Sequence, residues 1–201
     1  MEHVSEMVWE LFKQQRGFAK TKDIVKLGVT NYYIRKLEEE GKIVRIKQGL
    51  YRHANYEPEQ FNEWIEISKI IPNGVVCLLS AMSYYELTTY NPWEYQVAIF
   101  RYAKKPSLPE YPPIKVMYFS DNRFHLGVDE VVMDGNRIQI YDREKTICDM
   151  IFYREKVGID LMKEGLRNYL KQPGKNITKL MKYAQALRVK TILQKYLEVL
   201  L

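Results

Sequence analysis

Two glycines divide the segment 21–52, and they constrain what this chain can fold into more than any other feature. Gly28 follows a short apolar run that predicts a helix, with Thr21 as its candidate N-cap, and supplies a turn that tolerates positive φ. Gly41 ends a second amphipathic run, for which Thr30 is the candidate N-cap. The segment therefore predicts two helices joined by a tight turn.

The two short runs that follow, Lys42–Ile46 and Leu50–Arg52, are separated by Lys47-Gln48-Gly49 and predict a β-hairpin. An apolar helical face over about residues 3–14 predicts a further helix before them. Helix, tight turn, helix and hairpin in this order are typical of a winged helix-turn-helix. We therefore predict a DNA-binding domain over residues 1–55.

The second helix of this segment, Asn31 to Glu40, separates two faces at 100° per residue. The inward positions are Tyr33, Ile34 and Leu37, and the outward positions are Tyr32, Arg35, Lys36 and Glu39. A winged helix-turn-helix places such an outward face in the major groove of DNA, with the helix N-terminus nearest the base edges. Asn31 stands at that end.

Donors on the hairpin suit contacts with DNA phosphates. Together with the helix, they give the candidate DNA-binding residues Thr21, Thr30, Asn31, Tyr32, Arg35, Lys36, Arg45, Lys47, Gln48 and Arg52. The alternative interpretation is a solvated helix beside a charged turn, which is common on protein surfaces. Agreement of the helix, the caps, the two glycines and the basic hairpin favours DNA binding.

Residues 56–201 show mixed helix and strand signals. The predicted strands are Tyr95–Phe100, Ile114–Phe119, Gly127–Met133 and Asn136–Tyr141, the last two joined as a hairpin by Asp134-Gly135. The predicted helices start at Pro58, at Ala81 (ending at Leu87), after the cap Asp142, near Ile159, after Asn176 and near Ile192, while Val75–Leu79 is a strand or the entry to a helix. The fold class is α+β: an N-terminal winged helix-turn-helix followed by a mixed α+β domain with a helical C-terminus.

Charge is distributed unevenly along the 201 residues, whose formal net charge is +6. Residues 154–201 contain eleven Lys/Arg and four Asp/Glu, and within them Lys163, Arg167 and Lys171 repeat at every fourth position. We interpret these three as a second basic surface. This surface could add contacts with the DNA backbone, or it could dock an acidic or nucleic-acid partner. The alternative without a binding role is a solvated helix face.

Turns, caps and apolar positions form a recognisable pattern along the chain. Its parts are Leu27-Gly28-Val29, Ile34, Leu37, Gly41, Ile43, Arg45, Gly49-Leu50-Tyr51, Gly74–Met82, Tyr85-Glu86-Leu87-Thr88, Tyr141–Met150 and Gly158-Ile159-Asp160. This pattern resembles the abortive-infection AbiEi antitoxin family, although that family often has glycine where Glu86 stands. The resemblance implies a winged-helix regulator of a viral-defence operon, whose second domain is an antitoxin opposing a nucleotidyltransferase-like toxin without needing a stable complex with it.

Motifs for catalysis or metal binding are sparse. Cys77 and Cys148 are isolated in apolar surroundings and predict buried free thiols, and the three histidines lack metal-ligand spacing. The carboxylates Asp142, Glu144 and Asp149 surround Lys145, a cluster more typical of a helix cap with solvated first-turn acids than of a nuclease. We therefore expect no enzyme activity, no cofactor and no metal.

The sequence thus predicts a sequence-specific DNA-binding regulator that represses its own operon. Its expected partners are double-stranded operator DNA with inverted repeats and, through the resemblance, the toxin. We expect a cytoplasmic location, because the sequence has no signal-peptide pattern and no apolar run of membrane-spanning length. The alternatives are a winged-helix-fused nuclease or other nucleic-acid-processing enzyme, and an RNA-binding protein.

Overall fold

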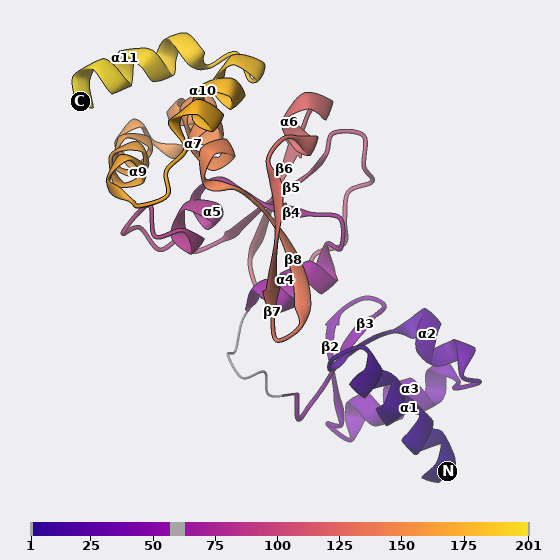
Figure 1. Cartoon of the computed structure of the whole chain (residues 1–201). Helices are drawn as coiled ribbons and strands as arrows, with labels where there is room; N and C mark the ends of the chain where they lie inside the picture. Colours follow the sequence, from indigo (N-terminus) through magenta and orange to yellow (C-terminus); the bar gives the residue numbers. More distant parts are fainter. Residues whose placement is uncertain (1, 57–62, 201) are drawn as a thin grey trace. The chain divides into compact units, whose positions relative to one another are not determined.

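The computed structural model of the chain describes residues 2–56 and 63–200 (Figure 1). Contacts divide the chain into two compact units. The first comprises Met1–Pro72, Lys105–Pro112 and Val132–Asn136, and the second comprises Asn73–Lys104, Pro113–Val131 and Arg137–Leu201. The domain boundary predicted between residues 55 and 56 lies beside residues outside the described ranges and stays a prediction.

The first unit begins with three helices and a small antiparallel sheet, as the indigo-to-purple part of Figure 1 shows. The elements are α1 (Glu2–Gln14), β1 (Phe18–Lys20), α2 (Thr21–Lys26), α3 (Asn31–Glu39), β2 (Ile43–Lys47), β3 (Leu50–His53) and, after residues outside the described ranges, α4 (Glu63–Ile70). The strand order is β1-β3-β2. The predicted helix start at Pro58 lies outside the described residues.

The turn between α2 and α3 forms as its residue types predict. Gly28 has a φ of +82°, and the Thr30 side chain accepts a hydrogen bond from the backbone N–H of Tyr33 at 3.3 Å. The prediction that Thr21 caps α2 is wrong, because Lys20 occupies the N-cap position without a side-chain hydrogen bond. Strand β1 runs directly into the helix, and the Thr21 N–H is bonded to the Gly49 carbonyl at 3.0 Å.

The hairpin is shifted by about one residue from its prediction. Its strands are β2 and β3, with Gly49 in the turn at a φ of +81° and a bulge between Arg45 and Lys47. Strand β1 was not predicted, because three residues are too few to establish a period. The core of these elements is one cluster of apolar side chains: Val8, Phe12, Ala19, Ile24, Val29, Ile34, Leu37, Ile43 and Tyr51.

The second unit contains most of a five-stranded mixed sheet in the order β6-β5-β4-β8-β7, with helices beside it. The strands are β4 (Val75–Val76), β5 (Tyr95–Phe100), β6 (Ile114–Phe119), β7 (Val128–Met133) and β8 (Asn136–Tyr141). The helices are α5 (Leu78–Tyr84), α6 (Asp121–His125), α7 (Arg143–Phe152), α8 (Arg154–Val157), α9 (Ile159–Lys171), α10 (Ile177–Ala186) and α11 (Lys190–Leu200). The mixed α+β class is confirmed, as is the Asp134-Gly135 hairpin turn, where both residues have positive φ.

Helix α5 begins three residues earlier than the predicted start at Ala81. The side-chain oxygen of Gln96 accepts a hydrogen bond from the Leu79 N–H at 3.0 Å, which satisfies one of the free donors at the helix start. This partner lies 17 residues away in the sequence. The short helices α6 and α8 were not predicted. Within the described residues, no helix combines the length and apolarity that crossing a membrane requires.

The acids around α7 are buried, so the prediction that they are solvated is wrong. Asp142 does cap the helix, accepting from the Lys145 N–H at 2.8 Å. Glu144 and Asp149 are only 4% and 0% exposed. Glu144 accepts a hydrogen bond from the Tyr169 hydroxyl at 2.8 Å, and Asp149 forms close ion pairs with both Lys145 and Arg123.

Aromatic rings surround the two cations of this cluster. The Lys145 ammonium lies 3.8 Å from the centroid of the Tyr141 ring, and the Arg123 guanidinium lies 3.8 Å from that of Phe152. Burial lowers the pKa of Lys145, and contact with Asp149 opposes part of that effect. One buried carboxylate therefore compensates two cations at the centre of the second unit.

We predict that Asp149→Asn lowers the free energy of unfolding by about 3–5 kcal/mol, because it leaves two buried cations without their counter-charge. Urea unfolding of the full chain measures this. Asp121→Asn is the matched control, since the Asp121 side chain is 76% exposed, and it should change stability by at most about 0.5 kcal/mol. Equal effects of the two substitutions would contradict the prediction.

Candidate nucleic-acid interface

The outer face of α3 presents the polar side chains that the helical period predicted. Asn31, Tyr32, Arg35 and Lys36 are all exposed, with Tyr32 at 79% of its full accessible surface. Ile34 and Leu37, on the opposite side, are buried in the core of the first unit. The core thus fixes the rotation of α3 about its axis and directs the polar row outward.

Charges near the C-terminal end of α3 partly neutralise one another. Glu40 lies 2.8 Å from the Lys42 ammonium and 3.8 Å from that of Lys36. The hydrogen bond from Lys42 holds the pKa of the Glu40 carboxyl below its usual range. Arg35 has no ion pair among the residues that the structure describes, so its guanidinium remains available for a ligand.

The four hairpin residues divide into two pairs. Arg45 and Gln48 are exposed. Lys47 donates to the backbone carbonyls of Ile70 at 2.8 Å and Ser107 at 3.3 Å, and Arg52 lies 3.2 Å from the Glu66 carboxylate. The first pair faces solvent, whereas the second pair is engaged in contacts within the first unit.

Burial and charge act together on the engaged pair. Burial, followed by the nearby charge of Lys20, lowers the pKa of Lys47. Burial raises the pKa of Glu66, and the charge of Arg52 opposes that rise. Lys20 was missed by sequence reasoning, because it lies on the unpredicted strand β1, and only the strand pairing brings it near the hairpin.

The remaining two candidates have mainly structural roles in the structure. The Thr30 hydroxyl caps α3, and the Thr21 backbone is held by Gly49. Both residues lie at helix starts, where backbone N–H groups of a DNA-bound helix-turn-helix also approach phosphates.

The second basic surface lies on α9, in the second unit. Arg167 and Lys171 are exposed and Lys163 is half-buried, and none of the three forms an ion pair with another described residue. The inward face of the same helix, Met162, Leu166 and Tyr169, is fully buried. The buried face therefore fixes the direction in which the row points from its helix.

Residues suited to metal or thiol chemistry are not brought together. Among the described residues, no three His, Cys, Asp or Glu side chains are grouped closely enough to hold a metal ion. The predicted free thiols are confirmed, since Cys77 and Cys148 are buried and unpaired. Burial raises the pKa of Cys148 to about 12, which keeps it protonated at neutral pH.

A comparison with known protein families matches the segment that contains most of α1 and all of α2, α3 and the hairpin. Residues 6–53 match a family model described as "Transcriptional regulator, AbiEi antitoxin". No curated protein matches the chain significantly. The match includes every candidate residue of the first unit, from Thr21 to Arg52. The resemblance that the sequence pattern indicated is confirmed for residues 6–53, which are similar to the AbiEi antitoxin transcriptional regulators.

Proposed function

We propose that this protein is a sequence-specific DNA-binding transcriptional regulator. The observation that carries the proposal is the exposed row Asn31, Tyr32, Arg35 and Lys36 on α3, inside the segment that matches a transcriptional-regulator family. In this proposal residues 1–55 form a winged helix-turn-helix, in which α3 is the recognition helix and the β2–β3 hairpin is the wing. Residues 56–201 then form the regulatory or antitoxin domain.

The dimensions of α3 suit the major groove of B-DNA. Its nine residues span roughly 13 Å, comparable to the groove width of about 12 Å. Arg35 has the paired donors that recognise a guanine, and the Asn31 amide can pair with an adenine. On inverted repeats, two copies of the chain would read two half-sites of an operator.

We assign the phosphate contacts of the wing chiefly to Arg45 and Gln48. Both are exposed, whereas Lys47 and Arg52 would have to leave the partners that they hold within the first unit. In this assignment Lys47 and Arg52 fix the position of the hairpin and add to its positive field.

The wider role that we propose is that of an antitoxin that represses its own operon in the cytoplasm. The similarity of residues 6–53 to AbiEi antitoxin transcriptional regulators supports an antitoxin and regulator role. Its partner would be a nucleotidyltransferase-like toxin, opposed without a stable complex. We propose no enzyme activity, because Asp142, Glu144 and Asp149, the carboxylates that a nuclease could use, each hold a structural partner.

Arg35→Ala tests the recognition helix. We expect it to weaken operator binding by about 1–3 kcal/mol and to relax the preference at one base position, because a bidentate contact with a base edge is lost. Titration of operator and random duplexes at one fixed salt concentration measures both effects. Lys13→Ala on α1 is the control, and its binding should match that of the unaltered chain. Equal losses on both duplexes would show that Arg35 contacts only the backbone.

Substitutions in the hairpin test the wing. We expect Arg45→Ala to weaken binding to all duplexes alike and to reduce the slope of log K against log salt by about one, since one phosphate contact is lost. Lys47→Ala should instead lower the free energy of unfolding by about 1 kcal/mol, because two carbonyl oxygens lose their donor. A reduced salt slope for Lys47→Ala at unchanged stability would reverse the assignment of the two residues.

Reversal of the second basic surface tests its role. We expect the triple variant Lys163→Glu, Arg167→Glu and Lys171→Glu to lose either operator affinity or antitoxicity. Loss of affinity with a smaller salt slope assigns the surface to DNA, and loss of growth rescue beside the toxin gene assigns it to the toxin system. Reversal of Lys182, Lys190 and Lys195 is a control with the same change of net charge. Retention of both activities would reduce the row to a solvated face.

A further inference from the structure

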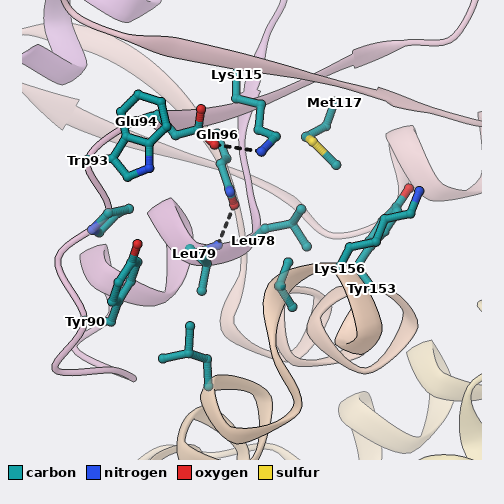
Figure 2. Close-up of a pocket in the computed structure, with 13 residues that line it drawn as sticks. Leu78, Leu79, Tyr90, Trp93, Glu94, Gln96, Lys115, Met117, Tyr153 and Lys156 are labelled. Carbon is teal, nitrogen blue, oxygen red and sulfur yellow. Dashed lines mark hydrogen bonds and ion pairs between the residues drawn. The ribbon is translucent and has the colours of Figure 1, made fainter.

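The second unit contains a cavity of about 360 Å³ beside the start of α5. Its lining comes from α5, the loop that follows it, β5, β6 and the α7–α9 region. In Figure 2, Trp93 and Tyr90 lie on one side of the cavity, Tyr153 and Lys156 on the opposite side, and Gln96 and Leu78 between them. Apolar and aromatic side chains thus form the walls, with a few polar groups among them, as in most small-molecule sites.

Helix α9 holds the start of the loop that carries the two aromatic rings. The Glu164 carboxylate accepts hydrogen bonds from the Thr89 backbone N–H at 2.7 Å and from the hydroxyls of Thr88 and Thr89 at 3.1 Å. The bond from the Thr89 backbone holds the pKa of Glu164 below its usual range, so the carboxylate stays charged at neutral pH. The Asn168 amide donates to the Leu87 carbonyl at 3.0 Å. The loop that carries Tyr90 and Trp93 is therefore fixed at its start.

The polar groups of the cavity are placed in two layers. Gln96 is 5% exposed, and its oxygen is used by the Leu79 N–H, so the amide NH₂ group is the donor that it can offer a ligand. Nearer the solvent, Lys115 lies 2.8 Å from Glu94, and the Lys156 ammonium lies 5.9 Å from the centroid of the Tyr153 ring. Two lysines against one glutamate leave a single positive charge.

We propose that this cavity binds a planar aromatic molecule that carries a negative charge. Trp93, which is 73% exposed despite its size, and Tyr90 supply faces on which such a ring stacks. Gln96 recognises a polar edge of the ring, and Lys156, with no ion pair among the described residues, attracts the anionic group. Nucleoside monophosphates and aromatic carboxylates share this chemistry.

The volume of the cavity agrees with a ligand of that size. Sites for drug-sized molecules occupy about 300–1,000 Å³, and the cavity lies at the lower end of that range. A single net positive charge favours one anionic group over several. The bonds at Thr88 and Thr89 already order the start of the loop, so less backbone ordering is needed when a ligand stacks on its rings.

Calorimetric titration of the full chain tests the proposal with two anions and their uncharged analogues. The probes are adenosine monophosphate against adenosine, and indole-3-acetate against indole-3-ethanol. We expect at least one anion to bind at least about threefold more tightly than its uncharged analogue. Added salt should reduce this difference in affinity, because it screens the charge. Binding of only one anion identifies the source of the ligand as a nucleotide or an aromatic acid. The proposal is overturned when neither anion, titrated up to about 5 mM, binds with a dissociation constant below about 1 mM.

Paired variants locate the binding site. Trp93→Ala should lower the affinity for the anion at least about fivefold, which is the lower end of the contribution from aromatic stacking. Lys156→Met should lower that affinity about threefold. Tyr102→Ala, which removes a similarly exposed ring outside the cavity, and Lys195→Met are the matched controls. Urea unfolding confirms that each variant folds. Equal affinity in Trp93→Ala, Lys156→Met and both controls would place the anion elsewhere and overturn the proposal.

Discussion

The buried carboxylate of Asp149 constrains the second unit, because it forms ion pairs with two buried cations, Lys145 and Arg123. Taking three charges out of water costs several kcal/mol for each ion, and the cost is offset only while the charges remain together. Arg123 comes from α6 and Lys145 from α7, so the ion pairs fix these two helices to each other. Helix α7 also packs against α5, α9 and α10, so the cluster lies on the helix that these three share as a neighbour.

Helix α9 has three rows of side chains, and each row lies in a different environment. Its apolar row is buried, and the next row, Glu164 and Asn168 with Gln172 at the C-cap, binds the segment from Tyr85 to Thr89. Lys163, Arg167 and Lys171 repeat at the same spacing, one position earlier. The first polar row is satisfied by backbone groups and by two threonine hydroxyls, whereas the basic row has no ion pair among the described residues. Rows 100° apart on a helix meet different neighbours, so structural and binding roles coexist without conflict.

The sequence predicted the elements whose signals are local. Helix α3 with its cap Thr30, strands β5 and β6, the hairpin at Asp134-Gly135 and the cap Asp142 all follow from turn chemistry and period. Two of the failures involve partners distant in the sequence. Gln96 extends the start of α5 from 17 residues away, and Arg123 reaches Asp149 across 26 residues. A single sequence contains no signal for such pairs.

In the candidate nucleic-acid interface, too, local features were predictable and contacts with distant residues were not. Helical period was sufficient to predict which residues of α3 face outward, because burial of Ile34 and Leu37 determines the rotation of the helix. It was not sufficient to rank the cations of the hairpin. The carbonyls of Ile70 and Ser107 and the carboxylate of Glu66, which occupy Lys47 and Arg52, come from other parts of the first unit.

The bulge in β2 explains why Arg45 and Lys47 differ in their surroundings. In a regular strand, residues two apart point to the same face, so both cations would share one environment. The bulge between them breaks that alternation, and Arg45 is exposed while Lys47 is partly buried. For Lys47 to reach a phosphate, it would forfeit two hydrogen bonds worth about 0.5–1.5 kcal/mol each. Arg45 has no such cost, because the irregularity of the strand leaves it exposed.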